Sequence, residues 1–182
     1  EDFPNNSIIA DMQSQLTRCT DSLDAFRTLV FSIKEQTSTS NRVNNLLTDI
    51  VENIRVNYPD IDVELVKKNQ EDVTIMANAS LLPAILNLIN NAIRATKIND
   101  AKKITLTSQV DKGSWHFIIR DYGLGFTLEK LKQLGIKPVT SEQGFGMAVF
   151  LSHASLERLG GKLVLTNHHE GGALVTLSLP VI

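Results

Sequence analysis

An asparagine-rich stretch in the middle of the chain gathers oxygen ligands. It reads Asn87-Leu88-Ile89-Asn90-Asn91-Ala92, and Asn87 and Asn91 are four residues apart, so they share one face of a helix. Their amide oxygens suit Mg²⁺, which usually arrives with nucleotide phosphates. Arg94 follows near the same end and could hold a phosphate. The alternative is structural, with amides that tie the helix to a strand, because a buried amide needs a partner.

A carboxylate followed by alternating glycines is the second place where chemistry is expected. The stretch Asp121-Tyr122-Gly123-Leu124-Gly125-Phe126 comes directly after an apolar run typical of a strand, and its glycines permit a tight turn that a Cβ would obstruct. A carboxylate at that strand end can accept a hydrogen bond from the exocyclic amine of adenine, and it would repel the carbonyl oxygen of guanine. The structural alternative is an ordinary glycine turn.

Two glycines at the start of a predicted helix form a third stretch, Gly144-Phe145-Gly146-Met147-Ala148. Free backbone N–H groups and the positive end of the helix dipole bind anions at such a terminus. The polar residues 135–143 before it are suited to form a lid. Taken alone, this pattern most often has a structural meaning. The sequence lacks the GxxxxGK[ST] pattern, which excludes a P-loop.

The composition of the chain excludes several classes of binding partner and of site. The 182 residues include 18 Lys and Arg against 20 Asp and Glu, a formal net charge of −2, so no overall charge favours nucleic acid or a membrane surface. Aromatic residues make up 5%, which disfavours base stacking. No apolar run approaches the roughly 18 residues of a membrane helix. A single cysteine, Cys19, excludes an internal disulfide and a cysteine-based zinc site.

The first segment, from Ser7 to about Gln36, is predicted to be one long helix. It contains no Pro or Gly, and apolar or small residues recur every three or four positions: Ile9, Met12, Leu16, Cys19, Leu23, Phe26, Val30 and Ile33. Such a heptad seam requires partner helices. The polar residues 37–41 are predicted to be a linker, which divides the chain into domains 1–40 and 41–182. Because the chain begins Glu-Asp-Phe-Pro, we expect a piece of a longer protein.

Helical and strand periods alternate through the rest of the chain. Helices are predicted over Val43–Asn57, from Leu81 to about Lys97 with Ser80 as N-cap, and from about Phe145 to Leu159. Strands are predicted over Ile61–Val66, Val73–Met76, Lys103–Val110, Trp115–Arg120, Lys162–Asn167 and Ala173–Leu179. Several of these strands should pair as hairpins, which indicates an α+β sandwich with one mixed sheet covered by helices on one face.

Taken together, the three stretches resemble the N, G1 and G2 boxes of the GHKL ATPase superfamily, in the form found in the catalytic domain of bacterial sensor histidine kinases. The resemblance covers residues 41–182 and includes a closing hairpin after Gly160-Gly161. It implies the Bergerat fold, an α/β sandwich, with ATP and Mg²⁺ as cofactors. It implies that Asn91, with Asn87, binds Mg²⁺, that Arg94 acts with Asn91 in catalysis, and that Asp121 binds adenine. The remaining nucleotide contacts that it implies are Gly123, Gly125, Gly144, Gly146 and Thr176.

The N-terminal helix is similar to the second helix of the dimerisation and phosphotransfer domain of these kinases, which forms a four-helix bundle with its twin. Its residues 18–23 resemble the RCxxIL stretch of RegB/PrrB-type redox-responsive kinases. Two roles for Cys19 remain open: a small hydrophobic residue of the seam, or a redox switch that links two chains.

No phosphoacceptor histidine motif is present, so the acceptor helix is expected upstream. His116 and His153 are expected to be structural. The adjacent His168 and His169 fall in a predicted hairpin turn and are expected to point apart, which disfavours a metal pair.

The function implied is the ATP-binding catalytic part of a two-component sensor histidine kinase. It would pass the ATP γ-phosphate to a histidine outside this sequence and then to a response regulator. The resemblance also implies a homodimer through the N-terminal helix, no nucleic acid, no membrane contact in this stretch, and the cytoplasmic portion of an inner-membrane-anchored bacterial kinase. Two alternatives are a GHKL serine kinase of the anti-sigma type, which lacks the long helix, and a nucleotide-binding module without catalysis.

Overall fold

The computed structural model describes residues 39–69, 71–133 and 145–182, together with positions 8, 9, 11, 12, 15, 16, 19, 20 and 23. Its helices are α2 (Val43–Asn57), α3 (Leu81–Ile98), α4 (Leu128–Gln133) and α5 (Phe145–Arg158). Its strands are β1 (Thr39–Arg42), β2 (Asp62–Lys67), β3 (Thr74–Ala77), β4 (Lys103–Asp111), β5 (Ser114–Arg120), β6 (Lys162–Asn167) and β7 (Ala173–Pro180). The predicted elements after residue 42 are therefore present, with ends shifted by one or two residues. The short helix α4 was not predicted.

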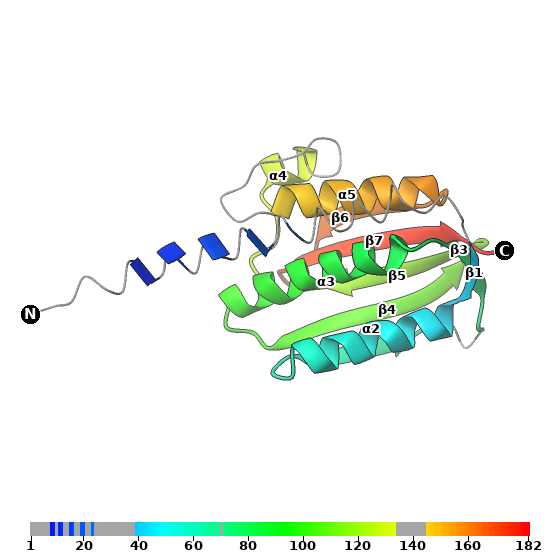
Figure 1. Cartoon of the computed structure of the whole chain (residues 1–182), viewed down its shortest axis with the longest axis horizontal. Helices are drawn as coiled ribbons and strands as arrows, with labels where there is room; N and C mark the ends of the chain where they lie inside the picture. Colours follow the sequence, from blue (N-terminus) through cyan, green and yellow to red (C-terminus); the bar gives the residue numbers. More distant parts are fainter. Residues whose placement is uncertain are drawn as a thin grey trace, which may run out of the picture.

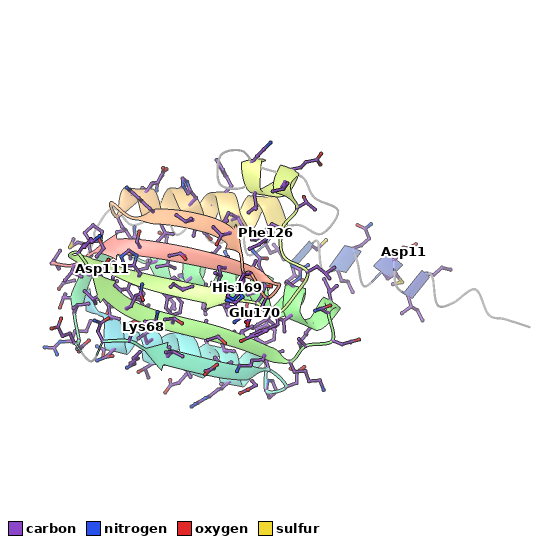
Figure 2. All side chains as sticks on the ribbon, turned by 180° about the vertical axis from the view of Figure 1, so that it is seen from behind. Asp11, Lys68, Asp111, Phe126, His169 and Glu170 are labelled. Atoms are coloured by element: carbon purple, nitrogen blue, oxygen red, sulfur yellow. The ribbon has the colours of Figure 1, made fainter. Side chains whose placement is uncertain are left out.

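A five-stranded sheet in the order β2-β4-β5-β7-β6 forms one layer of the molecule. Strands β2 and β4 are parallel and the other neighbours are antiparallel, which confirms the predicted mixed sheet. Helices α2, α3 and α5 lie side by side across one face of it (Figure 1). The opposite face carries no helix from the described part of the chain (Figure 2). The α+β sandwich expected from the sequence is thus confirmed.

Buried and partly exposed side chains alternate along the strands, which explains why helices cover one face of the sheet. In β5, Trp115, Phe117 and Ile119 are fully buried, whereas the residues between them are partly exposed. The buried set packs against apolar faces of the helices, such as Ile85, Leu88, Ile89 and Ile93 of α3. Burial of these side chains, roughly 1.5–3 kcal/mol for each, holds the helices to the sheet.

Residues 39–41 of the predicted linker, together with Arg42, are a strand in the structure. They form strand β1, which pairs antiparallel with β3 from Thr39 opposite Ala77 to Arg42 opposite Thr74. The side chains of β1 are mostly exposed, so no hydrophobic alternation signalled the strand; backbone pairing with β3 forms it. The predicted domain boundary at residues 40 and 41 falls inside this strand.

Ser80 also differs from its predicted role. It precedes α3, but its backbone is already helical and its side chain makes no capping hydrogen bond. Its hydroxyl instead donates to Asn78 Oδ1 over 2.7 Å, and the same oxygen accepts from the Ser80 backbone N–H over 3.1 Å. The side chain of Asn78 therefore stabilises the turn that precedes α3.

Most of the predicted N-terminal helix lies outside the described residues. The described positions are helical, and the seam residues among them (Ile9, Met12, Leu16, Cys19 and Leu23) are exposed. In the described part of the chain no helix is long and apolar enough to cross a membrane.

Candidate functional site

Asp121 lies immediately after β5, on the face of the sheet that the helices cover, with 5% of its surface exposed. Its oxygen Oδ1 accepts two backbone hydrogen bonds, from the N–H groups of Gly123 and Ala173, each 2.9 Å long. Its own N–H donates to the carbonyl of Ala173 over 3.1 Å. No described residue donates to the second oxygen, Oδ2. This arrangement fixes the carboxylate and leaves one oxygen for an external donor.

The protonation of Asp121 is set by opposing effects. Burial disfavours the charged form and is the largest of them, so the pKa of this carboxyl is raised above its usual value. The two backbone N–H donors and the charge of Arg120 act in the opposite direction. A hydrogen-bond donor from a ligand would stabilise the ionised form further.

The chain after Asp121 is attached to the last turn of α3. The Tyr122 N–H donates to Thr96 Oγ1 over 3.1 Å, and Asn99 Nδ2 donates to the Tyr122 carbonyl over 2.9 Å. Gly123 packs directly on the helix, because a Cβ at this position would lie 2.7 Å from the carbonyl oxygen of Ala95. A side chain at residue 123 would therefore separate the loop from α3.

This contact places the predicted ligands on α3 beside the same loop. Asn91 is four residues before Ala95 and so lies on the helix face that Gly123 touches, one turn away. Asn87 lies a further turn along that face and is buried, and Arg94 is half-buried beside it. Helix α3 thus carries Asn87, Asn91 and Arg94, and Asn91 lies one turn from Ala95, the residue that Gly123 contacts.

Asn91 has an unusual environment. Its side-chain nitrogen Nδ2 is buried, yet it has no hydrogen-bond partner among the described residues. A buried NH₂ group without a partner costs free energy, and because it is a donor, an acceptor such as a phosphate oxygen of a ligand would satisfy it. The amide oxygen is of the hard type that Mg²⁺ takes. The residue can therefore serve the expected cation with its oxygen and a phosphate with its nitrogen.

Asn167 at the end of β6 is a site residue that the sequence analysis missed. Its Oδ1 accepts from the Phe126 N–H and its Nδ2 donates to the Phe126 carbonyl, both over 2.8 Å. Gly125 lies against the same amide with φ of +75°, and a Cβ there would be 2.8 Å from Asn167 Oδ1. The second glycine of the loop is thus required by both its backbone conformation and this close contact. No local pattern links residues 41 positions apart, so only the fold reveals the pair.

The other predicted residues are placed differently. Gly146 is in the first turn of α5, and Gly144 and the predicted lid, residues 135–143, lie outside the described residues. Thr176 alternates with the buried Val175 and Leu177 of β7, so it faces the open side of the sheet. The structure does not bring Thr176 to Asp121, which faces the helices. The resemblance in sequence did not indicate on which face of the sheet Thr176 would lie.

Comparison with known proteins adds to this geometry. Residues 76–182 match the model of one family, described as histidine kinase-, DNA gyrase B- and HSP90-like ATPase. Among curated proteins, the sensor protein DegM of a Bacillus species is 25% identical over 150 residues, which cover 81% of this chain and 40% of DegM. The histidine protein kinase DivJ of Caulobacter vibrioides is 29% identical over 110 residues, or 57% of this chain and 18% of DivJ. The chain thus spans less than half the length of either relative.

Solved structures agree with this match at the level of the fold. The histidine kinase ThkA in complex with the response regulator protein TrrA has a TM-score of 0.71 and 19% identity, and the match covers all of this chain and 53% of that one. The ATP-binding domain of PrrB from Mycobacterium tuberculosis has a TM-score of 0.64 and 23% identity over 81% of this chain and 99% of that one.

Proposed function

The chain belongs to the histidine kinase-, DNA gyrase B- and HSP90-like ATPase family, a family of ATP-binding domains, and from this premise we propose that it is the catalytic part of a bacterial sensor histidine kinase. Among its relatives, DegM is named a sensor protein and DivJ a histidine protein kinase, and both names support this choice within the family. The observation that carries it is Asp121, a buried carboxylate with one oxygen fixed by two N–H groups and the other left for a ligand donor.

Each site residue then has a task. Asp121 accepts a hydrogen bond from the adenine amine, and residues 122–126 form the wall beside the base. Asn91, with Asn87, would hold Mg²⁺, which neutralises phosphate charge when it is bound, and Arg94 would hold a phosphate. Gly144 and Gly146 would supply backbone N–H groups to the phosphates at the start of α5. Together these residues position the γ-phosphate for transfer to a histidine that lies outside this sequence.

The wider assembly is part of the same proposal. Residues 1–40 would be the second helix of a dimerising bundle and residues 41–182 the ATP-binding domain. The exposed seam positions support pairing of two chains. Apolar residues at heptad spacing are buried when they pack against a partner helix. The ThkA complex contains a response regulator, and we extend that class of partner to this chain, together with anchoring of the whole kinase in the inner membrane.

Cys19 is the basis of a more specific proposal: that the chain belongs to the RegB/PrrB-type redox-responsive kinases. The cysteine is exposed and lies on the seam, so two paired helices would bring its copies near each other. A disulfide requires Cα atoms roughly 4.4–6.8 Å apart. Mild oxidation should therefore give a covalent dimer on a non-reducing gel, and Cys19→Ser should abolish it without changing ATP affinity. A persistent monomer would assign Cys19 to packing alone.

Calorimetry with ATP and GTP tests the adenine assignment. In the presence of Mg²⁺, the chain should bind ATP and ADP and should bind GTP much more weakly, because Asp121 repels the guanine carbonyl. Equal affinity for ATP and GTP would overturn the assignment.

Phosphotransfer tests the kinase assignment separately. With labelled ATP alone, the chain should take up no acid-labile phosphate, and labelling should appear on an added chain that carries the acceptor helix. Selective ATP binding without transfer to any acceptor helix would instead indicate a nucleotide-binding module.

A further inference from the structure

The turn between β6 and β7 carries a second cluster of side chains that can bind a metal ion. The turn is next to Asp121 in space, because the Ala173 N–H at its end donates to Asp121 Oδ1, but Glu170 pairs with Arg120, which precedes Asp121 and points to the opposite face of the sheet. It contains His168, His169 and Glu170, and Figure 2 shows His169 and Glu170 on the side of the sheet that no described helix covers. The sequence indicated that the two histidines point apart, and the structure corrects this: their ring centroids are 4.2 Å apart. The turn curls because the His168 N–H donates to the Gly172 carbonyl and the Gly171 N–H donates to the His168 carbonyl.

The three side chains converge on one small volume. One ligand atom from each of them lies within 4.8 Å of the other two. Glu170 Oε2 is 3.8 Å from His168 Nδ1 and 3.1 Å from Nη2 of Arg120, the last residue of β5. Figure 2 shows His169 and Glu170 next to each other at this end of the sheet. The cluster is thus a set of three donors with one competing cation.

We propose that His168, His169 and Glu170 form a binding site for a divalent transition-metal ion of the Zn²⁺ class. Two imidazoles and one carboxylate are a known donor set for Zn²⁺, with water completing the coordination. The ion would replace Arg120 as the partner of Glu170 and would break the 3.2 Å hydrogen bond from the Glu170 N–H to His168 Nδ1. Both losses reduce the net gain, so the site should be weaker than a closed structural zinc site.

Titration of the whole chain with Zn²⁺ in the absence of nucleotide tests the site. Calorimetry should show one saturable site, and Co²⁺ in its place should give a visible absorption band of low-coordinate cobalt. His169→Ala and Glu170→Gln should each weaken binding about tenfold or more, because loss of even an outer partner has that effect in metal sites. The matched control is His153→Ala, which removes a histidine 3.7 Å from Glu157 in α5 and should leave the affinity unchanged.

Arg120 gives a test of opposite sign. Arg120→Gln removes the competing cation and should tighten Zn²⁺ binding, whereas a site elsewhere on the chain would be unaffected. Circular dichroism of each variant checks that the fold is retained. The proposal is overturned if Zn²⁺ binding does not saturate, if Glu170→Gln binds as tightly as the original chain, or if the chain unfolded in urea binds Zn²⁺ equally well.

Discussion

The loop after β5 and the polar face of α3 meet at one site but are built in opposite ways. In the loop, the protein itself satisfies most polar groups: Asp121 Oδ1 accepts two N–H groups, and Asn167 pairs with both backbone groups of Phe126. On α3, Asn91 keeps a buried nitrogen without a partner among the described residues. The loop is therefore complete before a ligand arrives, whereas the helix face is not.

This difference separates two tasks in nucleotide binding. A rigid, prebuilt loop suits recognition of a flat base, because its donors and acceptors need no rearrangement on binding. A helix face with an unsatisfied amide suits a cation and phosphates, which bring their own ligands and water. Loss of the hydrogen bonds that hold the loop together should therefore affect affinity and folding together, whereas loss of the Asn91 amide on α3 should separate them.

The largest effect is expected at Asp121. Asp121→Asn replaces the free acceptor Oδ2 with an NH₂ donor, which opposes the adenine amine. Loss of this charge-assisted hydrogen bond should cost about 1.5–3 kcal/mol of ATP binding, a weakening of roughly 10- to 150-fold by calorimetry. The fold should not lose stability, because an Asn oxygen can still accept from Gly123 and Ala173 and burial no longer opposes a charge.

Asp111→Asn provides a matched control for that variant. Asp111 is exposed at the opposite end of the hairpin formed by β4 and β5, so its substitution should leave ATP affinity unchanged. If both variants bound ATP like the original chain, the comparison would be wrong about which region reads the base.

A smaller effect is expected at Asn167, which does not need to touch the nucleotide. Asn167→Ala removes both hydrogen bonds to Phe126 and should lower the free energy of unfolding by about 1–2 kcal/mol, measured by urea denaturation. ATP affinity should fall with it, because the loop that holds Asp121 loses its attachment to β6. Asn167→Asp keeps the acceptor for the Phe126 N–H and should recover part of both losses. Full affinity in a destabilised Asn167→Ala variant would show that the loop is held without β6.

The two regions also differ in how far the sequence could predict them. The spacing of Asn87 and Asn91 predicted that they share one face of a helix, and α3 contains both, because helix periodicity is local. The carboxylate at the end of β5 was likewise predicted from the apolar run before Asp121. Strand alternation gave the mixed sheet and its buried face, for the same reason.

What the sequence could not predict depends on contacts between distant segments and on the backbone conformation of one turn. The pairing of β1 with β3 and the bond between Asn167 and Phe126 each join residues more than thirty positions apart. The curl that brings His168 and His169 together comes from backbone bonds of a glycine turn. None of these contacts leaves a periodic pattern in the sequence.

A moderate effect is expected from pH, because the affinity for ADP should depend on the protonation of Asp121 in the loop. Burial raises the pKa of Asp121, and in the proposed adenine contact the ionised form would accept from the adenine amine. ADP affinity should therefore fall as the pH is lowered through this raised pKa, at a higher pH than for an ordinary exposed aspartate. Calorimetry across a pH series from about 8 to about 5 measures this. Asp121→Asn should lose that dependence, and an equal pH dependence in both proteins would assign it to another group.

The smallest effect on folding is expected at Asn91. Asn91→Ala removes a buried, unpartnered NH₂ group and places a better helix former in α3, so the free energy of unfolding should stay constant or rise by up to about 1 kcal/mol. The Mg²⁺-dependent part of nucleotide affinity should nevertheless disappear, as seen by calorimetry with and without Mg²⁺. Asn87→Ala is the matched control four residues earlier on the same face: Asn87 is already engaged in an interaction, so its loss should destabilise the fold. If Asn91→Ala were the more destabilising of the two, Asn91 would be a structural amide, and the cation would have to be held elsewhere.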